Sequence, residues 1–316
     1  MTIDTLPDDA LLIIFSQYRY RRDNVLLAKG KRLVDVCRRW RHVIFGSHRY
    51  LGLQLVFNSK TPTRATLDIW PPCPIIVKSW CPGMEYKDGE ENIIAGLERS
   101  DRVIDVQLNR LTCPAFQKFA AVMTVPFPAL KELRLWALLV DDIGPFLPAA
   151  FLGESAPCLE FFSLEGIAFQ AIRNLLLSAH HLRDLFLTDI PVNCSIPPQA
   201  IVACLSASPH LDYAAIGFRP NRPHDPGQTS RPPTTRAVLP ALTYFDFEGD
   251  LKYMEDLVSR IDAPKLRVLK IQLFDEAVPR FPQLRQFIAL TECFSSSSGY
   301  AFKQRRTDWF LSLYPF

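Results

Sequence analysis

The chain has 316 residues, of which 48% are hydrophobic and 22% charged, and its formal net charge is +3. This composition excludes a disordered chain, and the length is more than one small core needs, so we expect one small and one larger domain. No stretch approaches the ~20 apolar residues of a membrane-spanning helix, and the N-terminus lacks a signal-peptide pattern. The eight cysteines show no CxxC pair and no Cys/His ligand spacing, which predicts free thiols, no metal and an intracellular protein, cytoplasmic or nuclear.

The first segment predicts a short helix that begins near Pro7. Thr5 and Asp8 form a capping-box-like start, and a proline is tolerated in a first turn because its missing donor is not needed there. Apolar residues then follow at helical spacing on one face, at Leu11, Ile14, Phe15 and Tyr18. A short helix with so much apolar surface needs a covering partner.

A second striped segment follows at residues 33–45. Its apolar positions share helical spacing, and they are Leu33, Val36, Cys37, Trp40 and Ile44. Arginines occupy the rest of the circumference, and residues 1–50 hold ten Lys or Arg against five Asp or Glu. Nucleic-acid binding would fit this charge, but no helix-turn-helix or base-stacking signature accompanies it. A basic helix facing an acidic protein partner needs fewer assumptions.

Together the two segments resemble the F-box, the docking motif of ubiquitin-ligase receptors. The resemblance rests on Leu6-Pro7, the apolar run from Leu11 to Phe15, and Val36-Cys37-Arg38-Arg39-Trp40-Arg41. In that family such positions bind a Skp-family adaptor, which bridges to a cullin scaffold. The resemblance implies adaptor contacts at Leu6, Pro7, Leu11, Ile14, Phe15, Val36 and Trp40. The stretch from Arg19 to Lys31 departs from the family, since it is more basic and lacks a clear helix. By periodicity alone, two core helices of a larger domain would fit as well.

Residues 51–100 predict a connecting region that begins the second domain. Leu51, Leu53 and Leu55 alternate as in a strand, residues 75–77 form an apolar run, and residues 93–97 predict a short helix.

An LxxLxL triad then recurs seven times. The triads are Val103, Val106, Leu108; Leu130, Leu133, Leu135; Leu159, Phe162, Leu164; Leu182, Leu185, Leu187; Leu211, Ala214, Ile216; Leu242, Phe245, Phe247; and Leu266, Leu269, Ile271. Their first members lie 27, 29, 23, 29, 31 and 24 residues apart, mostly in the range of leucine-rich repeats. Four of the intervening segments have helical stripes, which begin at Phe116, Ile172, Ile201 and Met254. Residues 101–290 therefore predict a degenerate leucine-rich-repeat-like solenoid, in which stacked strand and helix units share a core. The Asn that many such repeats place after the triad is replaced by Leu138, Ile167 and Ile190.

The expected fold class is α/β, with an N-terminal all-α F-box-like helical module at residues 1–50 followed by this β/α solenoid. A doubly wound α/β enzyme is the competing fold, but GxGxxG, Walker and GxSxG patterns are absent from the sequence. His180-His181 and Asp141-Asp142 are better read as a turn and a solvated helix start than as catalytic or metal-binding groups. We therefore expect no enzymatic activity and no cofactor.

Period-two alternation turns the residues between the triad positions to the concave strand face, where a target protein would bind. The candidate target contacts are Arg134, Trp136, Phe161, Glu165, Phe186, Tyr213, Tyr244 and Asp246. The row contains large aromatic side chains, which are enriched in binding hot spots. The alternative is that flanking loops cover these side chains.

Two stretches depart from the repeat. Residues 219–236 hold five prolines and four arginines and predict a loop, for which a proline-rich recognition segment is the alternative. Residues 282–287 resemble the start of one more triad, but residues 291–316 form an atypical tail with no recognisable capping unit. A truncated last exon is one hypothesis for it.

The resemblance and the repeats together predict the substrate-recognition subunit of an SCF-type (Skp, cullin, F-box) ubiquitin ligase. The partners would be the adaptor, the cullin scaffold and an unknown target protein, with no nucleic acid and no membrane. One alternative is a leucine-rich-repeat interaction module that acts outside a ligase, with its N-terminal helices serving as a cap. Another is an enzyme whose active site is too dispersed to see in the sequence.

Overall fold

The computed structural model describes residues 5–17, 33–79, 89–139, 143–169, 172–192, 194, 196–220, 236–274, 280–291, 293–294, 303–305 and 308–314. The fold is mixed α/β, with a mostly parallel sheet. The chain divides into two compact units, Met1–Val106 and Gln107–Phe316. Among the described residues, no helix has the length and apolar character needed to cross a membrane.

The first unit begins with helices α1 (Asp8–Gln17) and α3 (Arg38–Gly46). Helix α1 begins one residue after Pro7, as the sequence predicts, and carries two acidic residues in its first turn, where the helix dipole favours them. Helical spacing over residues 33–45 predicts one continuous helix, and this prediction is wrong, because α3 begins only at Arg38. Cys37 is extended, with φ −156° and ψ 168°, and its Sγ accepts a hydrogen bond from the Trp40 amide, so it caps α3. Val36 therefore precedes the helix instead of sharing its stripe.

The rest of the first unit alternates strands and helices. It comprises β1 (Leu55–Phe57), α4 (Thr63–Ile69), β2 (Ile75–Lys78) and α5 (Glu90–Leu97), and β1 and β2 pair in parallel. A Cβ on Gly96 of α5 would lie 3.3 Å from side-chain atoms of Phe57 and Val77, so this helix packs closely on the strands. The strand that the alternation of Leu51, Leu53 and Leu55 predicts begins only at Leu55. Because α1 and α3 share one compact unit with these strands, a separate all-α module is not evident.

The second unit is built on the triads. After β3 (Val103–Leu111), which crosses the boundary between the units, the chain forms α6 (Cys113–Val122), β4 (Glu132–Ala137), the 3-10 helix η2 (Phe151–Glu154), β5 (Phe161–Glu165), α7 (Ile172–Ser178), β6 (Asp184–Ile190), α8 (Pro198–Ser206), β7 (Tyr213–Phe218), β8 (Ala237–Val238), β9 (Tyr244–Gly249), α9 (Leu251–Ser259), β10 (Ile261–Asp262) and β11 (Val268–Leu273). The last elements are α10 (Pro282–Leu290), β12 (Lys303–Arg305) and β13 (Asp308–Leu313).

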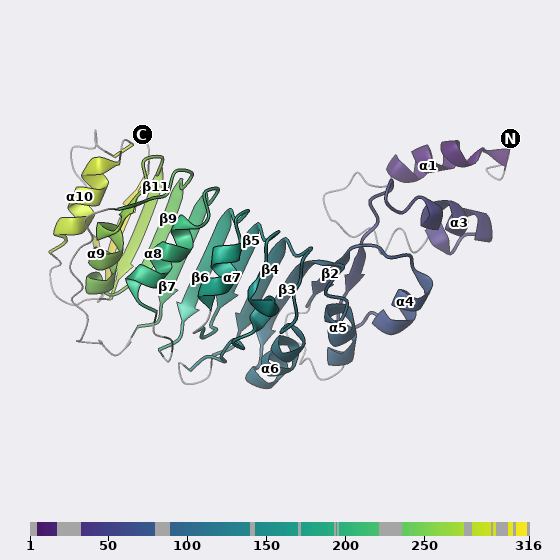
Figure 1. The fold of residues 1–316 in the computed structure, drawn as a ribbon, viewed down its shortest axis with the longest axis horizontal. Helices are drawn as coiled ribbons and strands as arrows, with labels where there is room; N and C mark the ends of the chain where they lie inside the picture. The colour runs from purple at the N-terminus through teal and green to yellow at the C-terminus, as the bar shows by residue number, and fades with distance from the viewer. Residues whose placement is uncertain are drawn as a thin grey trace. The chain divides into compact units, whose positions relative to one another are not determined.

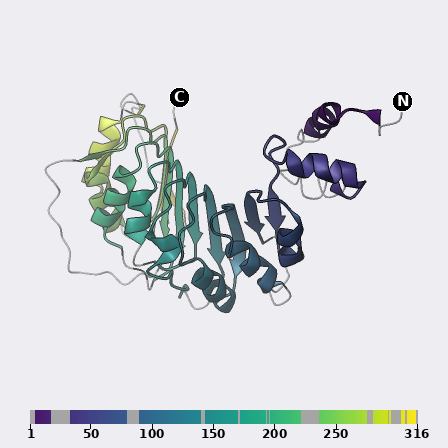
Figure 2. The same cartoon turned by 45° about the vertical axis from the view of Figure 1, so that its right-hand side comes forward.

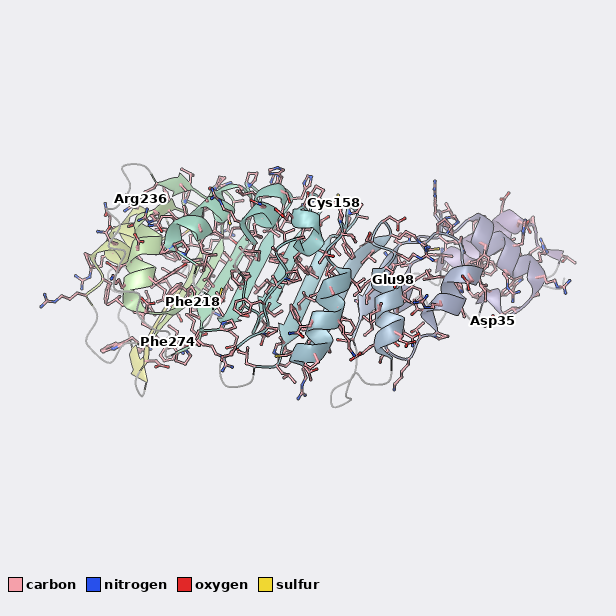
Figure 3. The ribbon with its side chains drawn as sticks, turned by 60° about the horizontal axis from the view of Figure 1, so that its bottom comes forward. Asp35, Glu98, Cys158, Phe218, Arg236 and Phe274 are labelled. Atoms are coloured by element: carbon pink, nitrogen blue, oxygen red, sulfur yellow. The ribbon has the colours of Figure 1, made fainter. Side chains whose placement is uncertain are left out.

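The order of the main-sheet strands from β4 onward is β4-β5-β6-β7-β9-β11-β13-β12, and the neighbours from β4 to β11 are parallel. Strands β8 and β10 form a separate parallel pair. In Figure 3, Cys158, which precedes β5, lies at the upper edge, whereas Phe218 and Phe274, at the ends of β7 and β11, lie at the lower edge. In a parallel sheet all strands begin at one edge and end at the opposite edge, as these residues do.

The triad side chains form the core between the sheet and its helices. The twelve second and third triad members of β4, β5, β6, β7, β9 and β11 are at most 3% exposed. Figures 1 and 2 show helices α6 to α9 on one face of this sheet. The predicted helical stripes are buried against the sheet, for example at Phe119, Leu176 and Leu257. The sequence prediction of alternating strands and helices is therefore confirmed.

Two hydrogen-bonding features recur from repeat to repeat. The amide of each first triad leucine, from Leu130 to Leu266, donates to the carbonyl three residues earlier at 3.1 to 3.4 Å. From Leu130 to Leu242, the carbonyl of the residue after that leucine accepts two amides from the next repeat, as Glu160 does from Arg183 and Asp184. These bonds fix the start of each strand relative to its neighbour, so the register places equivalent residues side by side.

The C-terminal part differs from the prediction. Residues 282–287 are not a triad but the start of α10. Strand β13 pairs antiparallel with β11, opposing Leu311 to Ile271, and β12 pairs with β13. The tail thus continues the sheet beyond β11, where no capping unit was recognised from the sequence. The proline- and arginine-rich stretch is described only at Arg219, Pro220 and Arg236, and residues 19–31 and Asp141-Asp142 lie outside the described residues.

Candidate binding surfaces

The sheet of the second unit has one face without helices among the described residues, which we call the strand face. It is formed by the residues of β4, β5, β6, β7, β9 and β11 that alternate with the buried triad positions. All eight predicted target contacts lie on it. Seven of them are half-buried, and Arg134 is exposed.

Four aromatic rings stack along the strand face, one from each of four adjacent strands. We call Phe161, Phe186, Tyr213 and Tyr244 the aromatic stack. Their ring centroids are 5.2, 4.6 and 4.1 Å apart in that order, and the interplanar angle decreases from 28° to 25° and then to 12°. Rings at such distances attract one another, so the stack is held rigid before any partner arrives.

A cation closes each end of the aromatic stack. The Arg134 guanidinium lies 3.9 Å from the Phe161 ring centroid, and the Lys270 ammonium lies 5.2 Å from that of Tyr244. Hydrogen bonding to Tyr244 raises the pKa of Lys270. Burial and a hydrogen bond with Tyr244 also raise the pKa of the Tyr213 hydroxyl, which therefore stays protonated at neutral pH. Since neighbouring groups cover the ring faces, the rings offer their edges to a partner.

Half-buried carboxylates flank the aromatic stack. Burial raises the pKa of Glu165, and the nearby Asp189 adds to the effect. Burial likewise raises the pKa of Glu248, which is further raised by Asp189, Asp246 and Asp308. The pKa of Asp246 is raised by burial against the lowering effect of Lys270. These groups carry negative charge where solvent compensates it poorly.

One row of equivalent positions crosses the strand face at its carboxyl end. It runs Trp136, Glu165, Thr188, Gly217, Glu248 and Gln272, one residue from each strand, and we call it the acidic row. Between β6 and β7 the register shifts after Leu187, so Thr188 and Gly217 are neighbours without being a regular pair. A Cβ on Gly217 would lie 3.6 Å from the Glu248 Oε2 and 3.7 Å from the Thr188 Cα. The middle of the row therefore lacks a bulky side chain, and Glu248 reaches over the gap.

In the first unit, α1 and α3 are held together by polar and aromatic contacts. Arg39 donates from Nε and Nη2 to the Asp8 Oδ1 at 3.0 and 2.6 Å and also to the Leu6 carbonyl. The Phe15 and Trp40 rings meet edge to face at 4.9 Å. Leu11 is 0% exposed and Phe15 3%, so their side chains form the core of this helix pair.

The predicted adaptor contacts thus fall into two sets. Leu11 and Phe15 offer no surface to a partner in this conformation, and Leu6 and Trp40 are half-buried. Pro7, Ile14 and Val36 are exposed, and Ile13 on α1 joins them at 60% exposed. We call Pro7, Ile13, Ile14 and Val36 the apolar patch. Ile13 lies outside the helical spacing of Leu11, Ile14 and Phe15, so the sequence pattern did not single it out as a contact.

Other candidates from the sequence do not form a site. His181 is exposed in the turn before β6, and the His180 Nδ1 lies 3.5 Å from the Ala207 carbonyl. Across the ranges that the structure describes, no three His, Cys, Asp or Glu side chains are placed to hold a metal ion, and seven cysteines are free thiols. No protein-family model matches the chain, and no curated protein matches it in sequence. Its function must therefore be argued from these surfaces.

Proposed function

We propose that the chain is the substrate-recognition subunit of an SCF-type ubiquitin ligase. In this proposal, α1 and α3 form an F-box-like docking element for a Skp-family adaptor, and the second unit is a leucine-rich-repeat-like solenoid that binds a target protein in the cytoplasm or nucleus. The observation that carries the target-binding role is the aromatic stack. Four adjacent strands each place one ring in it, on a face that lacks helices among the described residues.

The repeated geometry supports the solenoid. The same turn hydrogen bond precedes β4, β5, β6, β7, β9 and β11. Each of these strands pairs in parallel with the strand of a neighbouring repeat, with one register shift between β6 and β7 after Leu187. Stacked units of this kind share a core and present a continuous strand surface. Ile167 and Ile190, which follow their triads, are buried and pack in the core. They occupy the positions at which many leucine-rich repeats have a hydrogen-bonding Asn.

The apolar patch supports the adaptor role. Ile13, Ile14 and Val36 are 60%, 37% and 58% exposed, which leaves apolar area in water on a small helix pair. Arg38 and Arg41 are exposed nearby in the sequence and would favour an acidic partner surface. Such a receptor needs no catalytic residue, because holding a target near a charged ubiquitin carrier raises the effective concentration.

Co-purification with a Skp-family adaptor tests the proposal. The full chain is compared with the variant carrying Leu6→Ala, Pro7→Ala and Ile14→Ala and with Ile69→Ala, a control on α4, where Ile69 is 65% exposed. We expect adaptor with the native chain and the control and little with the triple variant. Absence of adaptor from the native chain, or equal recovery with all three proteins, would refute the adaptor role.

The second candidate function is an interaction module outside any ligase. It is favoured by the placement of α1 and α3 in one compact unit with β1 and β2, as expected of helices that cap the start of a repeat array. Target capture by the full chain without any adaptor in the same preparation would support this alternative.

A further inference from the structure

We propose that the strand face binds an extended, basic segment of the target, with two lysines or arginines four residues apart that pair with Glu165 and Glu248. The inference rests on the proposed target-binding role of the second unit and adds the chemical class of the ligand. It follows from the charge of the face, from the spacing of the acidic row and from the aromatic stack beside it.

The strand face is acidic although the chain is basic. Its positions carry five carboxylates, on Glu132, Glu165, Asp184, Asp246 and Glu248, against the two cations of Arg134 and Lys270. The difference of five and two gives a formal −3 on the face, while the whole chain has +3. Complementary charge steers and orients partners, so this face selects a basic one and disfavours nucleic acid or a phosphorylated segment.

The two cations of the face are already engaged. Arg134 lies over the Phe161 ring and 3.4 Å from Glu132, and Lys270 lies over Tyr244. Among the described residues, neither Glu165 nor Glu248 has a salt-bridge partner, whereas Asp189 between them has Arg219 at 3.5 Å. A cation from a ligand would offset the repulsion that Asp189, Asp246 and Asp308 exert on Glu248.

The acidic row sets the spacing of the ligand. Glu165 on β5 and Glu248 on β9 are three strand positions apart in the order β5-β6-β7-β9. Three spacings of about 4.8 Å separate the backbones at Glu165 and Glu248 by roughly 14 Å, which an extended peptide covers in about four residues, and the long basic side chains reach the carboxylate that leans over Gly217. In an extended segment, residues i and i+4 point to the same side, so both basic side chains can face the row. The residue between them would lie over Thr188, beside the Glu248 carboxylate that reaches over Gly217.

The aromatic stack lies beside the acidic row on the same strands. Phe186 is two residues before Thr188, and Tyr244 is four before Glu248. A segment laid across the strands would bring its apolar side chains and the stems of its basic residues against the ring edges. The rings are held by one another, so little conformational entropy is lost on binding.

Binding of synthetic peptides to the full chain tests the inference, measured by fluorescence anisotropy. The first peptide is a labelled ten-residue Ser/Thr/Ala segment with arginines four residues apart. Two comparison peptides have the same sequence except that one carries glutamates in place of the arginines and the other has its arginines three residues apart. We expect the first peptide to bind most tightly, and Glu165→Gln with Glu248→Gln to weaken it by roughly tenfold or more, as for lost charge-assisted bonds. The control Glu160→Gln, outside the strand face, should leave binding unchanged.

The isosteric Gln substitutions preserve shape, and a thermal melt of each variant checks that it folds. Equal binding of the arginine and glutamate peptides, loss of spacing preference, or an unaffected double variant would overturn the inference. Adaptor co-purification is measured on the same preparations. An intact adaptor complex without basic-peptide binding refutes this inference alone, whereas peptide binding without adaptor refutes the ligase role alone.

Discussion

Replacing Phe186 with alanine should destabilise the second unit by about 2–4 kcal/mol. Phe186 is the second ring of the aromatic stack and contacts two others, at 5.2 Å from Phe161 and 4.6 Å from Tyr213. Each stacked pair contributes about 0.5–1.5 kcal/mol beyond area burial, so the two pairs supply about 1–3 kcal/mol. The half-buried side chain adds part of the transfer term, and the total stays below the ~3–5 kcal/mol typical of a fully buried phenylalanine. Phe186→Leu keeps much of the apolar surface and should cost about half as much.

The assay is denaturant unfolding of the full chain followed by far-UV circular dichroism. Val125→Ala is the control, because Val125 is 46% exposed and its truncation should change the free energy of unfolding by less than about 0.5 kcal/mol. A Phe186→Ala change no larger than that of the control would show that the rings do not stack in solution. A leucine variant as unstable as the alanine variant would show that the retained apolar surface contributes little and that the ring contacts supply the whole effect.

Three further predictions concern other parts of the chain. Leu311→Ala should lower the free energy of unfolding by about 2–5 kcal/mol in the same titration, because this side chain is 2% exposed on β13; an unchanged midpoint would mean that the tail does not join the sheet. Gly166→Ala should lower the melting temperature, since Gly166 has φ +69° and a Cβ would lie 2.6 Å from the Ala137 carbonyl oxygen, whereas Gly46→Ala, with nothing within 4 Å, should not; equal melts would contradict the local geometry. Burial raises the folded-state pKa of Glu248 above its ordinary value of 4.5, so the folded state binds more protons, and the stability contributed by that group is fully present below 4.5 and lost as the pH rises through the folded-state pKa. Glu248→Gln should therefore reduce the decline of stability above pH 4.5 in denaturant titrations, and a steeper decline would refute that reasoning.

Most of the second unit could be predicted because its signal is repeated. The LxxLxL triads recur often enough that irregular spacing does not hide them, and each predicts a buried strand that the structure contains. The helical stripes between them, such as that beginning at Met254, predict the covering layer for the same reason. The strand-face residues follow from alternation alone, which is why all eight predicted target contacts lie on that face.

The remaining features depend on contacts that no local pattern encodes. The break at Cys37 arises because an extended residue caps α3 through its Sγ, and a helical stripe alone does not reveal that choice. Strand β13 has an alternation at Trp309, Leu311 and Leu313 that could have been noticed, but its pairing with β11 is long-range. The burial of Leu11 and Phe15 depends on how α1 meets α3, through Trp40. Sequence periodicity identifies apolar faces and leaves open which part of them a neighbouring element covers.

The most direct measurement is complex formation between the purified full chain and a purified Skp-family adaptor, by size-exclusion chromatography with light scattering. We predict a complex of one receptor and one adaptor for the native chain and for Ile69→Glu. Ile14→Glu combined with Val36→Glu should abolish it, because both changes place charge in the exposed apolar patch while Leu11 and Phe15 keep the helix pair packed. Separate elution of the native chain and the adaptor would contradict the proposed role as a ligase receptor.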